Sequence, residues 1–217
     1  MKKITLIILA AYFAAVICSP CFGATWYANA LNGQNINYTT GGAGWFQTDT
    51  GACTANGTQL TWDAQGNGDI FEANGCAGIV VNVDPRGTGL SGTQKVVLKT
   101  TEASGTFSAV TSTSPITIHA DITAVAGDGL TVTGTANANP ALSIVGNITG
   151  GNASGIEGVI DTHTVGTVVV TGDITGGTSS ITAYGYNYNS ATTNGLSITG
   201  NVTGNYAIGL ITSNSVS

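Results

Sequence analysis

The chain has 217 residues, of which only 7% are charged and 32 are glycine, whereas an ordinary soluble domain has roughly 25% charged residues and about 7% glycine. Five residues are cationic, and none of them follows Lys99. Nucleic-acid binding requires clustered Lys and Arg side chains that face phosphates, and an anionic membrane surface requires similar clusters. The composition therefore argues against both as partners.

Residues 1–23 have the three-part plan of a secretory signal peptide. Two lysines precede an apolar run that ends at Cys18, and Cys21 and Gly23 supply the small residues of a cleavage site. The run is shorter than the ~20 apolar residues of a transmembrane helix, so a membrane anchor is the weaker alternative. We expect a secreted or cell-surface bacterial protein that starts at Ala24 and does not insert into a membrane after cleavage.

The mature chain keeps two cysteines, Cys53 and Cys76. In an oxidising compartment the two most simply form a disulfide, and a loop of this length would stabilise the fold by about 3 kcal/mol. A metal site is a poor alternative because His119 and His163 lie far away in the sequence. No cofactor is expected.

A repeat of near-constant length organises the second half of the chain. Residues 144–151 recur at 170–177 and again at 198–204, with a diverged copy at 118–124. The copies are 26, 26 and 28 residues apart, within the range of roughly 20–50 residues that indicates a repeat architecture.

Each repeat contains three short apolar stretches, separated by connections rich in Gly, Asn, Ser and Thr. The first two alternate with strand period two. The third stretch is predicted at residues 156–160, 181–183 and 208–211. The pattern predicts an all-β protein, a right-handed parallel β-helix (solenoid) with about 26 residues per rung, in which stacking of the rungs creates the core.

The four repeat copies resemble coils of the pectin-lyase-like superfamily and of bacterial haemagglutinin or autotransporter-passenger adhesins. The resemblance covers roughly residues 70–217 and implies a right-handed β-helix domain there. Residues 24–69 hold all three tryptophans and Cys53. We expect this segment to be a disulfide-tied cap, because an uncovered solenoid end exposes backbone donors. At the other end, an open rung is expected to stack on another chain or to continue into a longer passenger.

Asp121, Asn147, Asp173 and Asn201 occupy one position of the repeat. Stacked strands lie about 4.8 Å apart, so these side chains are predicted to form a structural ladder along the stack. A calcium column is the alternative. It is disfavoured because the Gly-rich calcium nonapeptide is missing and the Asn rungs halve the charge.

Two further motifs are candidates for chemistry or binding. Asp161 and His163 would share one face of a strand, as a general base requires, but no G-x-S-x-G motif accompanies them and a polar turn is favoured. Tyr184, Tyr186 and Tyr188 alternate with Gly and Asn where the repeat grows to 28 residues. Insertions in solenoids map to loops, often on the binding face, so we predict a surface loop that binds a glycan or protein. The alternative is that the rings pack on the solenoid wall.

The leading hypothesis is a structural or adhesive β-solenoid that binds an extracellular glycan or surface protein. The alternative is a polysaccharide hydrolase or lyase. Asp121 and Asp173 would be about two rungs apart, or ~9.6 Å, so the separation of about 5–9.5 Å between hydrolase carboxylates does not by itself exclude them, but Asn147 lies between them. Lyases of the superfamily that the chain resembles use Arg or Lys, which the repeat region lacks.

Overall fold

The computed structural model describes residues 23–100, 105–110, 115–124, 129–133, 140–150, 157–163, 167–176, 183–189, 196–204 and 208–211. Within these residues the protein is all-β, with nineteen strands in three sheets and no helix. The all-β prediction is therefore confirmed. The predicted signal peptide, apart from Gly23, lies outside the described residues.

The three sheets have nine, six and four strands. The nine-stranded sheet has the order β18-β15-β12-β9-β6-β4-β1-β2-β3, and its strands are β1 (Thr25–Asn29), β2 (Gly44–Gly51), β3 (Thr54–Gln59), β4 (Ile70–Glu72), β6 (Val96–Thr100), β9 (Ala120–Ala124), β12 (Ile148–Thr149), β15 (Ile174–Thr175) and β18 (Val202–Thr203). The six-stranded sheet has the order β19-β16-β13-β10-β7-β5, with β5 (Ile79–Val80), β7 (Phe107–Val110), β10 (Leu130–Thr133), β13 (Glu157–His163), β16 (Ala183–Asn189) and β19 (Ile208–Ile211). The four-stranded sheet has the order β17-β14-β11-β8, with β8 (Ile116–Ile118), β11 (Leu142–Val145), β14 (Val168–Thr171) and β17 (Leu196–Thr199).

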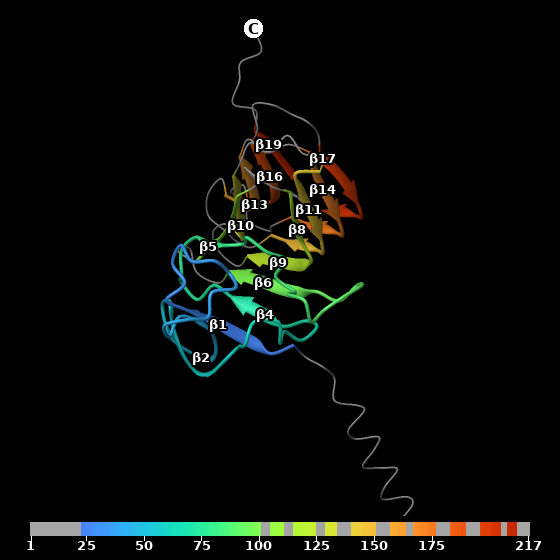
Figure 1. Ribbon diagram of the computed structural model, residues 1–217. Helices are drawn as coiled ribbons and strands as arrows, with labels where there is room; N and C mark the ends of the chain where they lie inside the picture. Colours follow the sequence, from blue (N-terminus) through green and yellow to red (C-terminus); the bar gives the residue numbers. More distant parts are fainter. Residues whose placement is uncertain are drawn as a thin grey trace, which may run out of the picture.

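From β8 onward the chain visits the four-, nine- and six-stranded sheets in turn and then begins again, so each strand pairs in parallel with its counterpart of the previous repeat (Figure 1). From β8 onward, the pairing register in the four- and nine-stranded sheets equals the sequence repeat, whereas the six-stranded sheet also pairs residues at other spacings, such as Leu130 with Ile160. Ile144 pairs with Ile118 on one side and with Val170 on the other, and Val170 pairs with Ile198. The strands predicted for the first two apolar stretches of each repeat are present.

Columns of apolar side chains fill the space between the sheets. The column from the nine-stranded sheet consists of one residue from each successive parallel strand, all buried: Trp26, Phe71, Leu98, Ile122, Ile148 and Ile174. The next residue in this register, Val202 on the final strand β18, is exposed. The core therefore runs without interruption from the N-terminal strands into the repeats.

Glycines at the bends of the repeat allow the stacked backbones to approach closely. A Cβ atom on Gly172 would lie 2.2 Å from the carbonyl oxygen of Gly146, and one on Gly200 would lie 2.2 Å from that of Gly172. Such distances leave no room for any side chain. The glycine of the repeat is thus required by the backbone of the preceding repeat.

The N-terminal region is built from unlike parts. Strands β1, β2 and β3 form an antiparallel meander at the edge of the nine-stranded sheet, while β1 also pairs in parallel with β4. Trp45 is fully buried there, edge-on to Phe71 at a centroid distance of 4.8 Å and stacked on Phe107 at 6.3 Å. The predicted disulfide between Cys53 and Cys76 is confirmed, and it ties the β2–β3 turn to the segment after β4.

Two local expectations are wrong. The tyrosine-rich segment is not a loop but strand β16, which pairs in parallel with β13 and β19. Asp161 and His163 are not in a turn but in β13, between β10 and β16. Polar and glycine residues favour turns in isolation, but pairing on both sides supplies backbone hydrogen bonds that outweigh this local preference.

Candidate functional site

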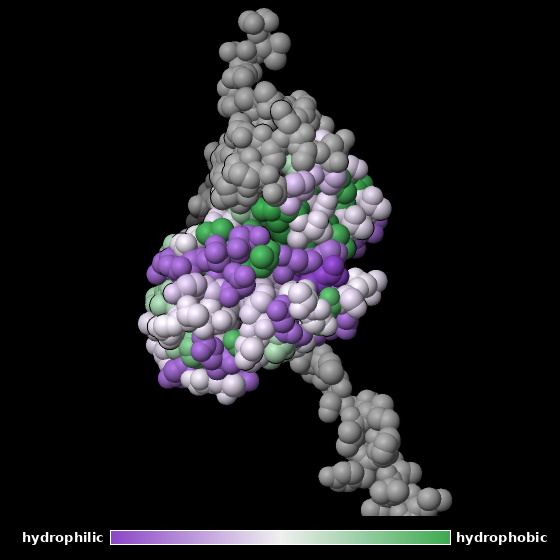
Figure 2. All heavy atoms as spheres, viewed as in Figure 1, coloured by the Kyte–Doolittle hydropathy of each residue, from purple (hydrophilic) through white to green (hydrophobic). Residues whose placement is uncertain are grey.

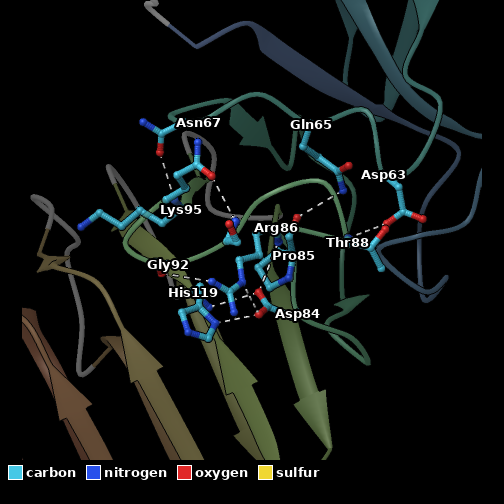
Figure 3. A network of polar contacts seen from close by, with 12 residues as sticks. Asp63, Gln65, Asn67, Asp84, Pro85, Arg86, Thr88, Gly92, Lys95 and His119 are labelled. Atoms are coloured by element: carbon cyan, nitrogen blue, oxygen red, sulfur yellow. Dashed lines mark hydrogen bonds and ion pairs between the residues drawn. The ribbon is translucent and has the colours of Figure 1, made fainter.

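A network of charged side chains lies in the loop between β5 and β6. The carboxylate of Asp84 accepts hydrogen bonds through Oδ2 from Nε of Arg86 at 2.8 Å, and the same oxygen lies 2.6 Å from Nδ1 of His119. Its Oδ1 accepts the backbone N–H groups of the same two residues at 3.2 and 3.3 Å. Figure 3 shows both side chains pointing toward Asp84. Asp84 is therefore a fixed hub that joins the loop to the residue between β8 and β9.

An open cleft of about 290 Å³ lies beside this hub. Its lining includes Asn37, Trp62, Asp63, Asp84 and Thr88. The half-buried Trp62 ring packs against the core, with its centroid 6.0 Å from that of Phe71. The cleft thus combines an indole face, two carboxylates, an amide and a hydroxyl.

The cleft is shaped by the close approach of the loop to the segment after β3. Asp63 Oδ1 accepts the backbone N–H of Thr88 at 2.8 Å, and Gln65 Nε2 donates to the carbonyl of Pro85 at 3.4 Å. Gly87 has φ +62°, and a Cβ atom there would lie 2.6 Å from Asp63 Oδ1 and 2.9 Å from Gln65 Nε2. A larger residue at this position would have to displace these side-chain ends, and the left-handed backbone conformation favours glycine.

The two carboxylates differ in their electrostatic surroundings. Asp84 faces the guanidinium of Arg86 and is saturated with donors. Asp63 is exposed, and among the described residues no cation forms an ion pair with it. Its Oδ2 is therefore the carboxylate oxygen of the cleft that can accept a hydrogen bond from a ligand.

Hydrophilic side chains gather in a band across the middle of the face shown in Figure 2, at the height where Figure 1 places β5, β6 and β9. Two further ion pairs belong to β6 and the residue before it. Lys95 Nζ lies 2.5 Å from Asp121 Oδ1, and Lys99 Nζ lies 3.3 Å from Glu72 Oε2. Each cation after Gly23 therefore pairs with an acid.

The four residues of the predicted ladder are joined from one strand to the next. The side-chain oxygens of Asp121, Asn147 and Asp173 accept the backbone N–H of the following member at 2.6, 3.0 and 2.8 Å. The amide of Asn201 also donates to Asp173 Oδ1 at 3.2 Å. In most of these bonds a backbone N–H donates to a side-chain oxygen, so Asp and Asn can both serve as the acceptor.

The predicted binding residues Tyr184, Tyr186 and Tyr188 lie on β16, and their side chains are outside the described part of the structure. The register places Tyr186 in one column with Phe107 and Leu130, which are both buried. The side chains of Asp161 and His163 on β13 are likewise outside the description. Neither motif is among the described residues that line the cleft.

Sequence reasoning missed the cleft and its hub. Asp84 and His119 are 35 residues apart, and Asp63 and Thr88 are 25 apart, without any repeat to relate them. One signal was available. The segment Asp84-Pro85-Arg86-Gly87 places two charges and two turn-forming residues together in a chain that is only 7% charged.

Comparisons with protein-family models, with curated proteins and with solved structures found no match. The described residues contain no group of three or more His, Cys, Asp or Glu side chains that could hold a metal ion. Nor does this part of the chain include a helix with the length and apolar character needed to cross a membrane.

Proposed function

We propose that this protein is a secreted bacterial β-solenoid with a structural or adhesive role, which binds an extracellular glycan through the cleft beside Asp84. The observation that supports a parallel β-helix is the ordered visit to three sheets whose strands from β8 onward pair in parallel, in two of the sheets at the spacing of the sequence repeat. The right-handed form is proposed because crossover connections between parallel strands are right-handed in nearly all known cases. Each rung buries its apolar residues only against its neighbours, as in stacked repeat proteins.

Secretion is supported by two independent features. The first 23 residues have the plan of a signal peptide, and the Cys53–Cys76 disulfide is of the kind that forms in oxidising compartments. The haemagglutinin and autotransporter adhesins that the repeats resemble are candidates for the wider family.

The cleft carries the binding proposal. Sugars present apolar C–H faces and hydroxyl groups, which suit an aromatic face with polar groups around it. Trp62 supplies the face, while Asp63 Oδ2, Asn37 and Thr88 can bond hydroxyls. A volume of about 290 Å³ is at the lower end of the usual range for ligand pockets, which is roughly 300–1,000 Å³, and suits a single sugar unit.

The test measures binding of methyl glucoside, methyl galactoside and N-acetylglucosamine to the mature chain by ligand-observed NMR. We expect at least one sugar to bind with a Kd of about 1 mM. Trp62→Ala and Asp63→Asn should each weaken it at least about tenfold, or about 1.4 kcal/mol. Asp49→Asn, which changes an exposed carboxylate on β2, is the matched control and should have no effect. Wild-type protein that binds none of the three sugars would contradict the assignment of the cleft.

A second experiment tests whether the tyrosines of β16 carry the adhesive role. Replacing Tyr184, Tyr186 and Tyr188 with serine should leave sugar binding at the cleft unchanged. If the folded triple variant loses attachment to cells or matrix while Trp62→Ala retains it, the adhesive role stands and its surface is β16. If the triple variant unfolds, the rings pack in the core.

A further inference from the structure

The backbone nitrogen of Ala24 points at a buried carboxylate. It donates a hydrogen bond to Asp69 Oδ1 at 2.7 Å, while Oδ2 accepts Trp26 Nε1 at 2.9 Å and the backbone N–H of Gly66 at 2.8 Å. Asp69 is only 4% exposed. These three donors are uncharged as long as residue 23 remains attached to Ala24.

A buried carboxylate normally requires a positive partner, because removal of an unpaired charge from water is costly. Among the described residues, no Lys, Arg or His forms an ion pair with Asp69. The cations nearby in sequence are already engaged, since Lys95 pairs with Asp121 and Lys99 with Glu72. Within the described part of the chain, the carboxylate of Asp69 is thus held by uncharged donors alone.

We propose that Asp69 is the binding site for a new N-terminus, the α-ammonium group created when an endopeptidase cleaves between Gly23 and Ala24. Cleavage adds one water across the peptide bond, leaving a carboxylate on Gly23 and an amine on Ala24 that takes up a proton. An α-amine is mostly protonated at neutral pH, since its ordinary pKa is about 7.7–8.0. The inference rests on the secretory processing proposed above.

The position of the new ammonium is fixed by its own strand. The backbone N–H of Ile70 donates to the carbonyl of Ala24 at 2.8 Å, and the next residue, Thr25, pairs with Ile70 at the start of β1. The nitrogen thus already occupies the position that an ion pair requires, and removal of the leader changes its charge rather than its place. The pair would lock the first strand onto β4, next to the buried Trp26.

A chain with one more residue is the matched control. Gly23 is accommodated in the structure, and a chain that begins there keeps the Ala24 N–H but moves the ammonium one residue away from Asp69. The experiment compares Asp69→Asn with wild type in chains that begin at Ala24 and at Gly23, by denaturant unfolding. We expect the substitution to raise the unfolding equilibrium constant at least about tenfold more in the Ala24 chain, or about 1.4 kcal/mol.

An equal effect in both chains would overturn the proposal, because Asp69 would then act only through Trp26 and Gly66. Should Asp69→Asn prevent folding, the Ala24 chain with an acetylated N-terminus replaces it, since acetylation removes the charge and keeps one N–H. That form should unfold with a constant at least about tenfold higher than the free amine; no difference overturns the proposal. The mass of the exported protein distinguishes a failure of the secretory processing from a failure of the ion pair with Asp69. Retention of the leader refutes secretory processing itself, whereas an Ala24 terminus without the energetic coupling refutes the ion pair alone.

Discussion

The N-terminal strands and the repeats solve the same packing problem by different means. In the N-terminal region the packing relies on unlike contacts, such as those of the Trp45 ring with Phe71 and Phe107 and a disulfide, and partly exposed ion pairs lie around this core. From β8 to β19 one set of contacts recurs in each repeat, with aliphatic residues in register. Strands that repeat in register can be packed with aliphatic side chains alone. The aromatic, charged and disulfide-bonded side chains therefore lie mainly in the region where the sequence does not repeat. The cleft and the Asp69 site both lie in the irregular region.

The largest effect is expected from a charge placed in the repeated core. Val170 is fully buried between Ile144 and Ile198, while its neighbour Thr171 is exposed. Val170→Asp should lower the free energy of unfolding by about 4 kcal/mol or more, because it buries an unpaired charge. Thr171→Asp should change it by less than about 0.5 kcal/mol. Similar urea midpoints for the two variants would show that the register of β14 is wrong.

The disulfide tests how strongly the irregular region depends on a covalent link. Replacing both Cys53 and Cys76 with serine should lower the free energy of unfolding by about 3 kcal/mol, because the unfolded chain regains the freedom of the loop. The measurement is thermal or denaturant unfolding of the double variant beside reduced wild type, and the two should agree. A free-thiol assay that labels both cysteines in denatured, unreduced wild type would contradict the pairing.

The glycine at the repeat bend tests the close stacking of rungs. Gly172→Ala should cost about 1–3 kcal/mol, because its Cβ would press on the carbonyl of Gly146. Gly41→Ala is the control: its φ is +65°, but a Cβ there meets no atom within 4 Å, so only the backbone cost of roughly 1 kcal/mol remains. Equal losses in chemical denaturation would mean that the rungs are not in close contact at Gly172.

The smallest effect is expected from the polar ladder. Asn147→Ala removes an exposed acceptor for the N–H of Asp173 and should cost about 0.5–1 kcal/mol. Asp173→Asn keeps the acceptor for the N–H of Asn201 and should be nearly neutral. The comparison is made by unfolding in urea. A larger loss for Asp173→Asn than for Asn147→Ala would show that the charge, rather than the acceptor, matters.

The sequence pattern predicted strands and their pairing well where residues recur at a fixed spacing, and poorly elsewhere. Alternation predicted the first two strands of each repeat, and the spacing of 26 residues predicted which strands pair. The insertion rule failed at β16: the growth of the repeat to 28 residues predicted a loop, whereas β13 and β19 provide pairing partners for a strand on both sides. Strand pairing is a contact between distant parts of the chain, so it cannot be predicted from the local preferences of single residues.

By itself the sequence determined the all-β class, the repeat register and the pairing of Cys53 with Cys76, because each depends on a period or on a single available partner. Only the tertiary structure decided which polar residues meet. Ala24 reaches Asp69 across 45 residues, and His119 reaches Asp84 across 35, with no spacing rule that relates them. A contact that recurs in each repeat produces a periodic pattern in the sequence, whereas a contact made once produces no such pattern and is found only in the folded structure.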